Sequence, residues 1–129
     1  MQAQRDLKAF NTLGLSATAH RFVPVATSSE LDSTLRDAQS RGPIHVLGGG
    51  SNVVLQPVIS GTLLHIGIKG RALRADDGKV AVVCAGAGEN WHDFVLWCHH
   101  RGLHGLANLA LIPGSVGAAP IQNIGAYGV

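Results

Sequence analysis

The sequence predicts a mixed α/β fold of the α+β class, divided into two lobes between residues 68 and 69. Three observations predict this fold. A helix over residues 28–41 lies between two short apolar segments. An Asp-Asp-Gly turn separates two more apolar segments, and an amphipathic segment over residues 90–101 follows them. We therefore expect a first lobe over residues 1–68 and a second over residues 69–129.

The helix over residues 28–41 has start and stop signals. Thr27 and Glu30 have the spacing of a capping box, in which each side chain bonds the main-chain amide of the other residue. Gly42-Pro43 ends the segment, because neither residue continues a helix well. The apolar face of this helix consists of Leu31, Leu35 and Ala38.

Short strands flank the helix. The segment Phe22–Ala26 precedes it, and Pro24 predicts a sheet edge or a strand end there, because proline has no amide to donate. The segment Ile44–Leu47 follows it, so the three elements form a β-α-β unit, for which a right-handed crossover is the rule. A further strand is predicted over Thr62–Ile66.

A glycine loop follows the strand Ile44–Leu47. It consists of Gly48, Gly49, Gly50, Ser51 and Asn52, and a further predicted strand, Val53–Leu55, comes after it. Consecutive glycine amides form a nest that binds an anion without a cationic side chain, and a pyrophosphate suits it. A Rossmann fingerprint is disfavoured because Val53 replaces its third glycine, and a Walker A loop is excluded because no Gly-Lys-Ser/Thr follows.

The second lobe begins with a predicted hairpin and a helix. The turn Asp76-Asp77-Gly78 has hairpin chemistry and precedes a predicted strand, Lys79–Ala85. The segment Asn90–Arg101 is amphipathic, and Gly102 ends it. Its apolar stripe consists of Trp91, Phe94, Val95 and Cys98. Trp91 and Trp97 are predicted core residues, and stacking on a ligand ring is the less favoured alternative.

Two groups of polar residues have both a local and a functional interpretation. Asn11 and Thr12 are expected to cap a turn. A metal site at His99, His100 and His104 is disfavoured, because no cluster of Cys or carboxylate residues supports it.

The last part of the chain is uncharged. From Gly102 to Val129 there is no Asp, Glu, Lys or Arg, and four glycines follow Pro113. Such a stretch is either a tightly packed turn region or a main chain that a ligand approaches closely. A second uncharged stretch, from Gly42 to Ile68, contains the glycine loop. The occurrence of both favours a ligand.

Composition excludes several classes of partner. The net charge is +2 and the cationic residues are scattered, so we expect no nucleic acid partner. No apolar run is long enough to span a membrane and the opening residues, Met1–Lys8, are polar, so we expect no membrane partner and a cytoplasmic location. Cys84 and Cys98 form no CxxC motif, which is typical of a reducing compartment.

Four motifs together resemble the UDP-N-acetylenolpyruvoylglucosamine reductase family, flavoenzymes also called UDP-N-acetylmuramate dehydrogenase or MurB. They are Leu47–Val53, Gly86–His92, Gly105–Gly114 and Pro120–Gly128. The segment Asn11–Gly14 also resembles the opening Asn-Thr-Phe-Gly motif of the family, with Leu13 in place of the aromatic residue. The resemblance covers essentially the whole chain.

The resemblance implies a two-lobed FAD-binding module of the vanillyl-alcohol-oxidase (PCMH) type. It assigns Gly48–Asn52 to the pyrophosphate of FAD. The second flavin-contacting stretch that it implies consists of Ile112, Pro113, Gly114, Gly117, Ala118, Ala119, Ile121, Gly125, Tyr127 and Gly128. Some members of the family have serines at the positions of Ala118 and Ala119, so we expect main-chain contacts there in place of hydroxyl contacts.

The resemblance also implies a reaction. The family passes hydride from NADPH to FAD and then to the enolpyruvyl group of a UDP-sugar, in peptidoglycan synthesis. The serine proton donor, the glutamate and the arginine of that step have no counterpart in this sequence. We therefore expect the cofactor-binding part of such an enzyme, with an incomplete second lobe, exposed strand edges and no turnover by itself.

Two alternatives remain open at the level of the sequence. The first is an autonomous or remnant module that binds a flavin or a nucleotide. The second is a flavin oxidase of related fold that acts on another sugar or alcohol. The sequence does not specify an oligomeric state.

Overall fold

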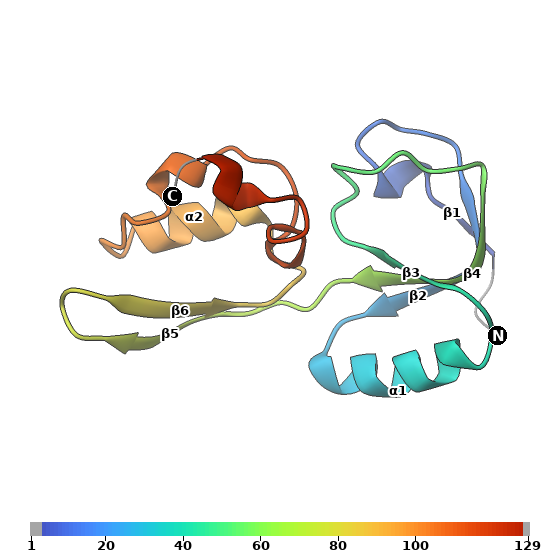
Figure 1. Ribbon diagram of the computed structural model, residues 1–129, viewed down its shortest axis with the longest axis horizontal. Helices are drawn as coiled ribbons and strands as arrows, with labels where there is room; N and C mark the ends of the chain where they lie inside the picture. The colour runs from blue at the N-terminus through green and yellow to red at the C-terminus, as the bar shows by residue number, and fades with distance from the viewer. Residues whose placement is uncertain (1–3, 128–129) are drawn as a thin grey trace. The chain divides into compact units, whose positions relative to one another are not determined.

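The computed structural model of the chain describes residues 4–127, with the main chain alone at Tyr127. The chain divides into two compact units, Met1–Ile68 and Lys69–Val129, which we call the N-terminal unit and the C-terminal unit. The N-terminal unit contains a four-stranded sheet, and the C-terminal unit contains a two-stranded hairpin (Figure 1). Each unit also contains one α-helix, so the predicted mixed α/β fold is confirmed.

The sheet of the N-terminal unit has the strand order β1-β2-β4-β3. Its strands are β1 (Arg5–Asp6), β2 (Thr18–Val25), β3 (Ile44–Leu47) and β4 (Val58–Ile66). Strand β1 is antiparallel to β2, whereas β4 is parallel to both β2 and β3. The predicted β-α-β unit therefore exists, but β4 lies between its two strands.

Strand β2 explains how the sheet accommodates Pro24. Strand β1 pairs with β2 only at Thr18 and Ala19, so farther along β2 has a ladder partner on one side only. Pro24 lies in that part of β2, opposite His65 of β4. Pro24 therefore lies where β2 is an edge within the described residues, and the predicted edge position is confirmed.

Helix α1 (Ser28–Gln39) begins at the predicted capping box. The Glu30 amide donates to Thr27 Oγ1 at 3.2 Å, and Glu30 Oε2 accepts from the amides of Thr27 and Ala26 at 3.1 and 2.9 Å. The helix ends two residues earlier than predicted, with Ser40 as its C-cap. Its apolar face packs on one face of the sheet, where the cluster consists of Val23, Val25, Leu64, Leu31, Leu35, Ile44, Ile66 and Ile68.

Loops cover the opposite face of this sheet (Figure 1). Residues 7–17, which include the short 3-10 helix η1 (Lys8–Phe10), and residues 48–57 contribute the apolar side chains. The cluster consists of Leu7, Ala17, Ala19, Leu47 and Leu63, with Phe10, Phe22, Val53, Leu55 and Ile59 packed around it. Two segments far apart in the sequence therefore share one layer.

The predicted strand Val53–Leu55 is wrong. These residues have no ladder partner, and the next strand begins only at Val58. Val53 and Leu55 pack into the cluster beneath the loops, whereas Val54 is 82% exposed. The apolar run that predicts a strand therefore belongs to a loop, which packs its first and third side chains on a sheet face and leaves the second exposed.

The C-terminal unit begins with the predicted hairpin. Strand β5 (Arg71–Asp76) is antiparallel to β6 (Ala81–Ala85), and the turn Asp76-Asp77-Gly78 lies at their junction. The β6 strand starts two residues later than predicted. Each strand of the hairpin has a free outer edge within residues 4–127, and Leu73, Val80 and Val82 are exposed.

Helix α2 (Trp91–His99) follows, capped by Asn90 and two residues shorter at its end than predicted. Its predicted apolar stripe is confirmed, since Trp91, Phe94, Val95 and Cys98 are all buried. Three 3-10 turns complete the unit: η2 (Ala107–Leu109), η3 (Val116–Ala118) and η4 (Ile124–Tyr127). Neither α-helix, nor any other helix within residues 4–127, has the length and apolarity needed to cross a membrane.

Candidate functional site

The glycine loop lies at the carboxyl end of β3 and leaves its amides free. Within the described part of the chain, no main-chain amide of residues 48–52 donates to a protein acceptor. Five successive N–H groups therefore lack a protein acceptor, of which that of Gly50 belongs to a buried residue, and the loop carries no carboxylate that would compete with an anion. Free consecutive amides of this kind form an anion-binding concavity, which is the chemistry that the sequence predicts for this loop.

Gly50 brings the loop into main-chain contact with the N-terminal segment. The Thr12 amide donates to the Gly50 carbonyl oxygen at 3.0 Å. Gly50 has a φ of +69°, and a Cβ there would overlap the Phe10 carbonyl oxygen and lie 2.8 Å from the Asn11 Cα. A glycine is therefore required at this position by a protein neighbour, independently of any ligand.

Asn11 supports the segment against which Gly50 rests. Its Nδ2 donates to the carbonyl oxygens of Leu7 and Leu15 at 2.9 and 3.0 Å, and its Oδ1 accepts from the Leu15 amide at 2.9 Å. The predicted turn cap at Asn11 is confirmed, and the side chain is buried. The sequence analysis did not predict that Asn11 supports the glycine loop through this segment. The Asn11–Gly14 motif was the one feature of the sequence that could have indicated it.

The second predicted stretch is held by residues 86–92. The Trp91 amide donates to the Gly114 carbonyl oxygen at 3.0 Å, the Val116 amide to the Glu89 carbonyl oxygen at 2.9 Å, and the Gly117 amide to the Ala87 carbonyl oxygen at 2.9 Å. The Trp91 Nε1 donates to the Leu109 carbonyl oxygen at 2.8 Å. Residues 109–117 therefore run alongside residues 86–92 and take their shape from them.

Gly117 permits the closest approach in this arrangement. A Cβ at Gly117 would lie 2.7 Å from the Ala87 Cβ and 3.1 Å from the Ala87 carbonyl oxygen. Real Cβ atoms do not approach a neighbour so closely, so a larger residue would push the two segments apart. This contact was not predicted, although Ala87 belongs to the Gly86–His92 motif.

Glu89 connects these segments to the hairpin. Its Oε1 accepts from the Gly70 amide at 2.9 Å, and its Oε2 accepts from the Arg71 Nε and Nη2 at 2.8 and 2.6 Å. The Gly70 amide, and then the Arg71 guanidinium, lower the pKa of this buried carboxyl below its ordinary value. Glu89 is thus a charged anchor that sequence reasoning did not single out.

The predicted residues of the second stretch have different environments. Ile112 and Ala118 are half-buried, whereas Pro113 and Gly125 are exposed and Ile121 is 87% exposed. Gly128 and the side chain of Tyr127 lie outside the described residues. The two predicted stretches belong to different units, and their joint contact with one cofactor remains a prediction.

Ala118 and Ala119 have no free main-chain donors. Their amides donate to the carbonyl oxygens of Ser115 and Val116 at 3.0 and 3.2 Å, and their own carbonyl oxygens accept from Gln122 and Ile124. Ala119 is also part of the hydrophobic core. Main-chain donation to a cofactor at these two positions would therefore require the loss of an internal bond, unlike donation from the glycine loop.

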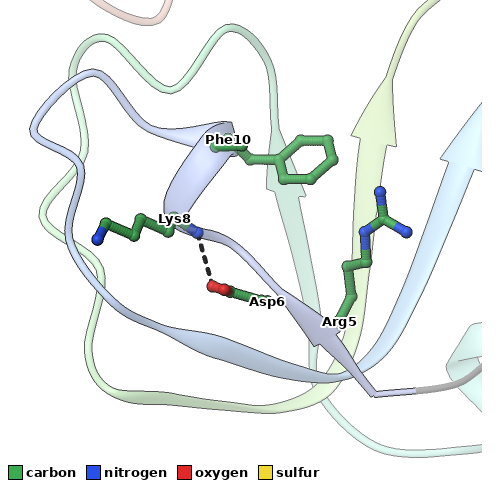
Figure 2. A pocket seen from close by; sticks show the side chains of 5 residues that line it. Arg5, Asp6, Lys8 and Phe10 are labelled. Carbon is green, nitrogen blue, oxygen red and sulfur yellow. Dashed lines mark hydrogen bonds between the residues drawn. The ribbon is translucent and has the colours of Figure 1, made fainter.

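Other polar features involve residues outside the two predicted stretches. An open hollow of about 550 Å³ in the N-terminal unit is lined by Arg5, Asp6, Lys8, Ala9 and Phe10, where the Lys8 amide donates to the Asp6 carboxylate (Figure 2). The rings of His99 and His104 are joined by a 2.9 Å Nδ1–Nδ1 hydrogen bond. No group of three metal-ligating side chains occurs among residues 4–127.

Comparison with known proteins defines the class. The model of a family described as "FAD binding domain" matches residues 19–129, which include the glycine loop and the second predicted stretch. The chain therefore belongs to this FAD-binding domain family.

Particular relatives carry a common name, UDP-N-acetylenolpyruvoylglucosamine reductase. The chain is 49% identical to the protein of that name from Pseudomonas putida, over 99% of this chain and 38% of that protein. It is 54% identical to the one from an Azoarcus species, over 96% of this chain and 37% of that protein. The chain thus spans somewhat more than a third of the length of these relatives.

A solved structure agrees with these relatives. The crystal structure of UDP-N-acetylenolpyruvylglucosamine reductase (MurB) from Thermus caldophilus matches with a TM-score of 0.66 and 28% sequence identity. The match covers 92% of this chain and 41% of that one. The resemblance stated from the sequence motifs is confirmed by these comparisons.

Replacement of Gly50 tests the contact with the N-terminal segment. We expect Gly50→Ala to destabilise the N-terminal unit by about 3 kcal/mol, because left-handed strain adds to overlap with a main chain. Gly14→Ala is the matched control, since Gly14 has a φ of +63° and open space around it; it should cost only about 1 kcal/mol. Hydrogen exchange of β4 amides measures both losses, and equal losses would contradict the contact.

Replacement of Gly117 tests the approach to Ala87. We expect Gly117→Ala to destabilise the C-terminal unit by about 2 kcal/mol, and Gly105→Ala, which meets no neighbour within 4 Å, to have little effect. Both tryptophans lie in this unit, so their fluorescence in a urea titration reports its unfolding. Adding Ala87→Gly should restore part of the loss, and no restoration would argue against the contact.

The Glu89 anchor predicts a pH dependence. Because folding lowers the pKa of Glu89, its stabilisation is present above the unfolded value of about 4.5 and is lost as the pH falls through the folded value. Tryptophan fluorescence should show the urea midpoint falling below about pH 4.5. Glu89→Gln should lower stability at pH 7 by about 2 kcal/mol and flatten this decline, whereas Asp93→Asn should retain it. An unchanged decline in Glu89→Gln would refute the assignment.

Proposed function

We propose that this chain is the FAD-binding part of a UDP-N-acetylenolpyruvoylglucosamine reductase, an oxidoreductase of peptidoglycan synthesis. The observation that carries the proposal is the match of the FAD-binding domain family to residues 19–129, which contain both predicted stretches. The names shared by the relatives support the choice of reductase. The proposed activity belongs to the whole enzyme. This chain covers 38% and 37% of the length of these two relatives.

The geometry of the glycine loop fits the cofactor. The free amides of Gly48–Asn52 would donate to pyrophosphate oxygens, and the absence of side chains at the three glycines leaves the main chain open to them. Several amides of the second stretch have no protein acceptor within the described residues: those of Ile112, Gly114, Ser115, Ile121 and Gly125. These amides, rather than those of Ala118 and Ala119, are the donors that the stretch can offer.

The proposal assigns distinct roles to the cofactor and the chain. Bound FAD supplies the hydride chemistry, with NADPH as the proposed hydride donor and the enolpyruvyl group of a UDP-sugar as the acceptor. The residues of this chain bind and orient, because the serine, glutamate and arginine that the resemblance implies for the proton-transfer step have no counterpart in this sequence. We therefore expect FAD binding by this chain, without turnover.

A fluorescence titration with FAD tests this proposal. We expect saturable quenching by the folded chain, competition by ADP, and at least tenfold weaker binding of riboflavin, which lacks the pyrophosphate. Gly49→Asp should weaken FAD binding by at least tenfold through repulsion of the phosphates, whereas the uncharged Gly49→Asn, of the same shape, should weaken it much less. Riboflavin binding should be the same in the two variants.

Three results would contradict the proposal. Absence of FAD binding by a chain whose circular dichroism shows it folded would do so. Equal FAD affinity in Gly49→Asp and Gly49→Asn would remove the glycine loop from the pyrophosphate site. Oxidation of another sugar or alcohol with consumption of oxygen, in place of NADPH oxidation by the whole enzyme, would favour the flavin oxidase.

A further inference from the structure

Leu111 has a main-chain conformation that its own side chain does not explain. Its φ is +65°, in the left-handed region that residues other than glycine rarely adopt. The side chain is 79% exposed, so burial does not hold it there. Leu111 directly precedes Ile112-Pro113-Gly114, the start of the second predicted flavin-contacting stretch. An unfavourable conformation at this point therefore needs a specific contact to maintain it.

His92 supplies that contact. The Leu111 amide donates to the His92 Nδ1 at 3.1 Å. His92 lies in the first turn of α2, where Asn90 Oδ1 caps the helix by accepting from the Asp93 amide at 3.0 Å. The neighbouring Trp91 binds the main chain on both sides of Leu111, at Leu109 and at Gly114. His92 is thus the central one of three contacts that shape the stretch.

The direction of this hydrogen bond determines the protonation state of His92. Because the Leu111 amide is a donor, Nδ1 must be an acceptor, and the ring must be neutral with its proton on Nε2. Protonation of Nδ1 would place two N–H groups face to face and break the bond. The Leu111 main chain would then lose the one side-chain acceptor that the structure gives its amide.

We propose that His92 is a positioning residue for the flavin, which holds Leu111 and thereby orients Ile112-Pro113-Gly114 only while its Nδ1 is unprotonated. This inference rests on the proposed FAD-binding function, and it adds a residue and a pH dependence to it. His92 itself need not touch the cofactor, because it acts through the Leu111 main chain.

Few other charges can produce this pH dependence. Residues 109–117, which lie against His92, contain no titratable side chain. On α2 the other titratable side chains are Asp93, Cys98 and His99, and the C-cap His100, Arg101 and His104 follow the helix. In the preceding segments, Glu89 is paired with Arg71, and Lys69 donates to the Gly88 carbonyl oxygen. A pH response of the Leu111 amide is therefore assigned to a histidine, and comparison with the signals of each histidine ring identifies which one.

The first measurement follows the Leu111 amide by NMR without FAD. We expect its ¹H–¹⁵N shift, followed from pH 8 to pH 5, to change together with the signals of the His92 ring in the same samples. His99→Asn should keep this titration and His92→Asn should abolish it. A Leu111 amide that does not titrate with the His92 ring would overturn the proposal.

The second measurement follows FAD affinity with pH, in three variants. We expect the Kd of the unaltered chain to rise at least fivefold from pH 8 to pH 5.5. His92→Asn, whose Oδ1 can accept at the same place and does not titrate, should stay near the pH 8 affinity throughout. His92→Leu, which has no acceptor, should bind at least fivefold more weakly at both pH values. A purely structural role would lower affinity without this pH profile.

The two measurements separate this proposal from the function on which it rests. A chain that binds FAD with the same Kd at both pH values overturns the role of His92 and leaves the proposed function in place. A folded chain that binds no FAD at any pH overturns both the proposed function and the flavin part of the inference. The NMR titration then still decides whether His92 holds Leu111, because it needs no cofactor.

Discussion

The two predicted stretches depend on the same physical constraint, glycines that lie so close to a neighbouring segment that no Cβ would fit between them. In the N-terminal unit this happens at Gly50, which rests on the main chain of Phe10 and Asn11. In the C-terminal unit it happens at Gly117, which rests on Ala87. In both places a single methyl group would separate two segments that hydrogen bonds otherwise join. The packing of the protein therefore requires these two glycines, whether or not a ligand is bound.

The main-chain amides distinguish the two stretches. The glycine loop takes part in a contact through the Gly50 carbonyl oxygen, so its amides stay free to donate to an anion. In the second stretch most amides are already bonded, to residues 86–92 or within the 3-10 turns. The first stretch therefore offers charge complementarity to phosphate, whereas the second offers a shaped, uncharged surface.

Sequence reasoning succeeded where the determinants are local and failed where they are not. The capping box of Thr27 and Glu30 predicted the start of α1, because both partners lie within one turn. The stripe from Trp91 to Cys98 predicted the buried face of α2 for the same reason. The apolar run at Val53–Leu55 predicted a strand that does not exist, since a short run of apolar residues does not reveal whether a ladder partner is near.

The sequence by itself determined the class of protein, and it predicted the two lobes and the residues of the candidate site, because composition, helix caps and motifs depend only on the order of residues along the chain. Only the tertiary structure decided what holds that site. The Glu89 anchor joins residues 19 positions apart, and Thr12 meets Gly50 across 38 positions. The link from His92 to Leu111 also spans 19 positions. Contacts at such separations follow from packing of whole segments, which no local pattern encodes.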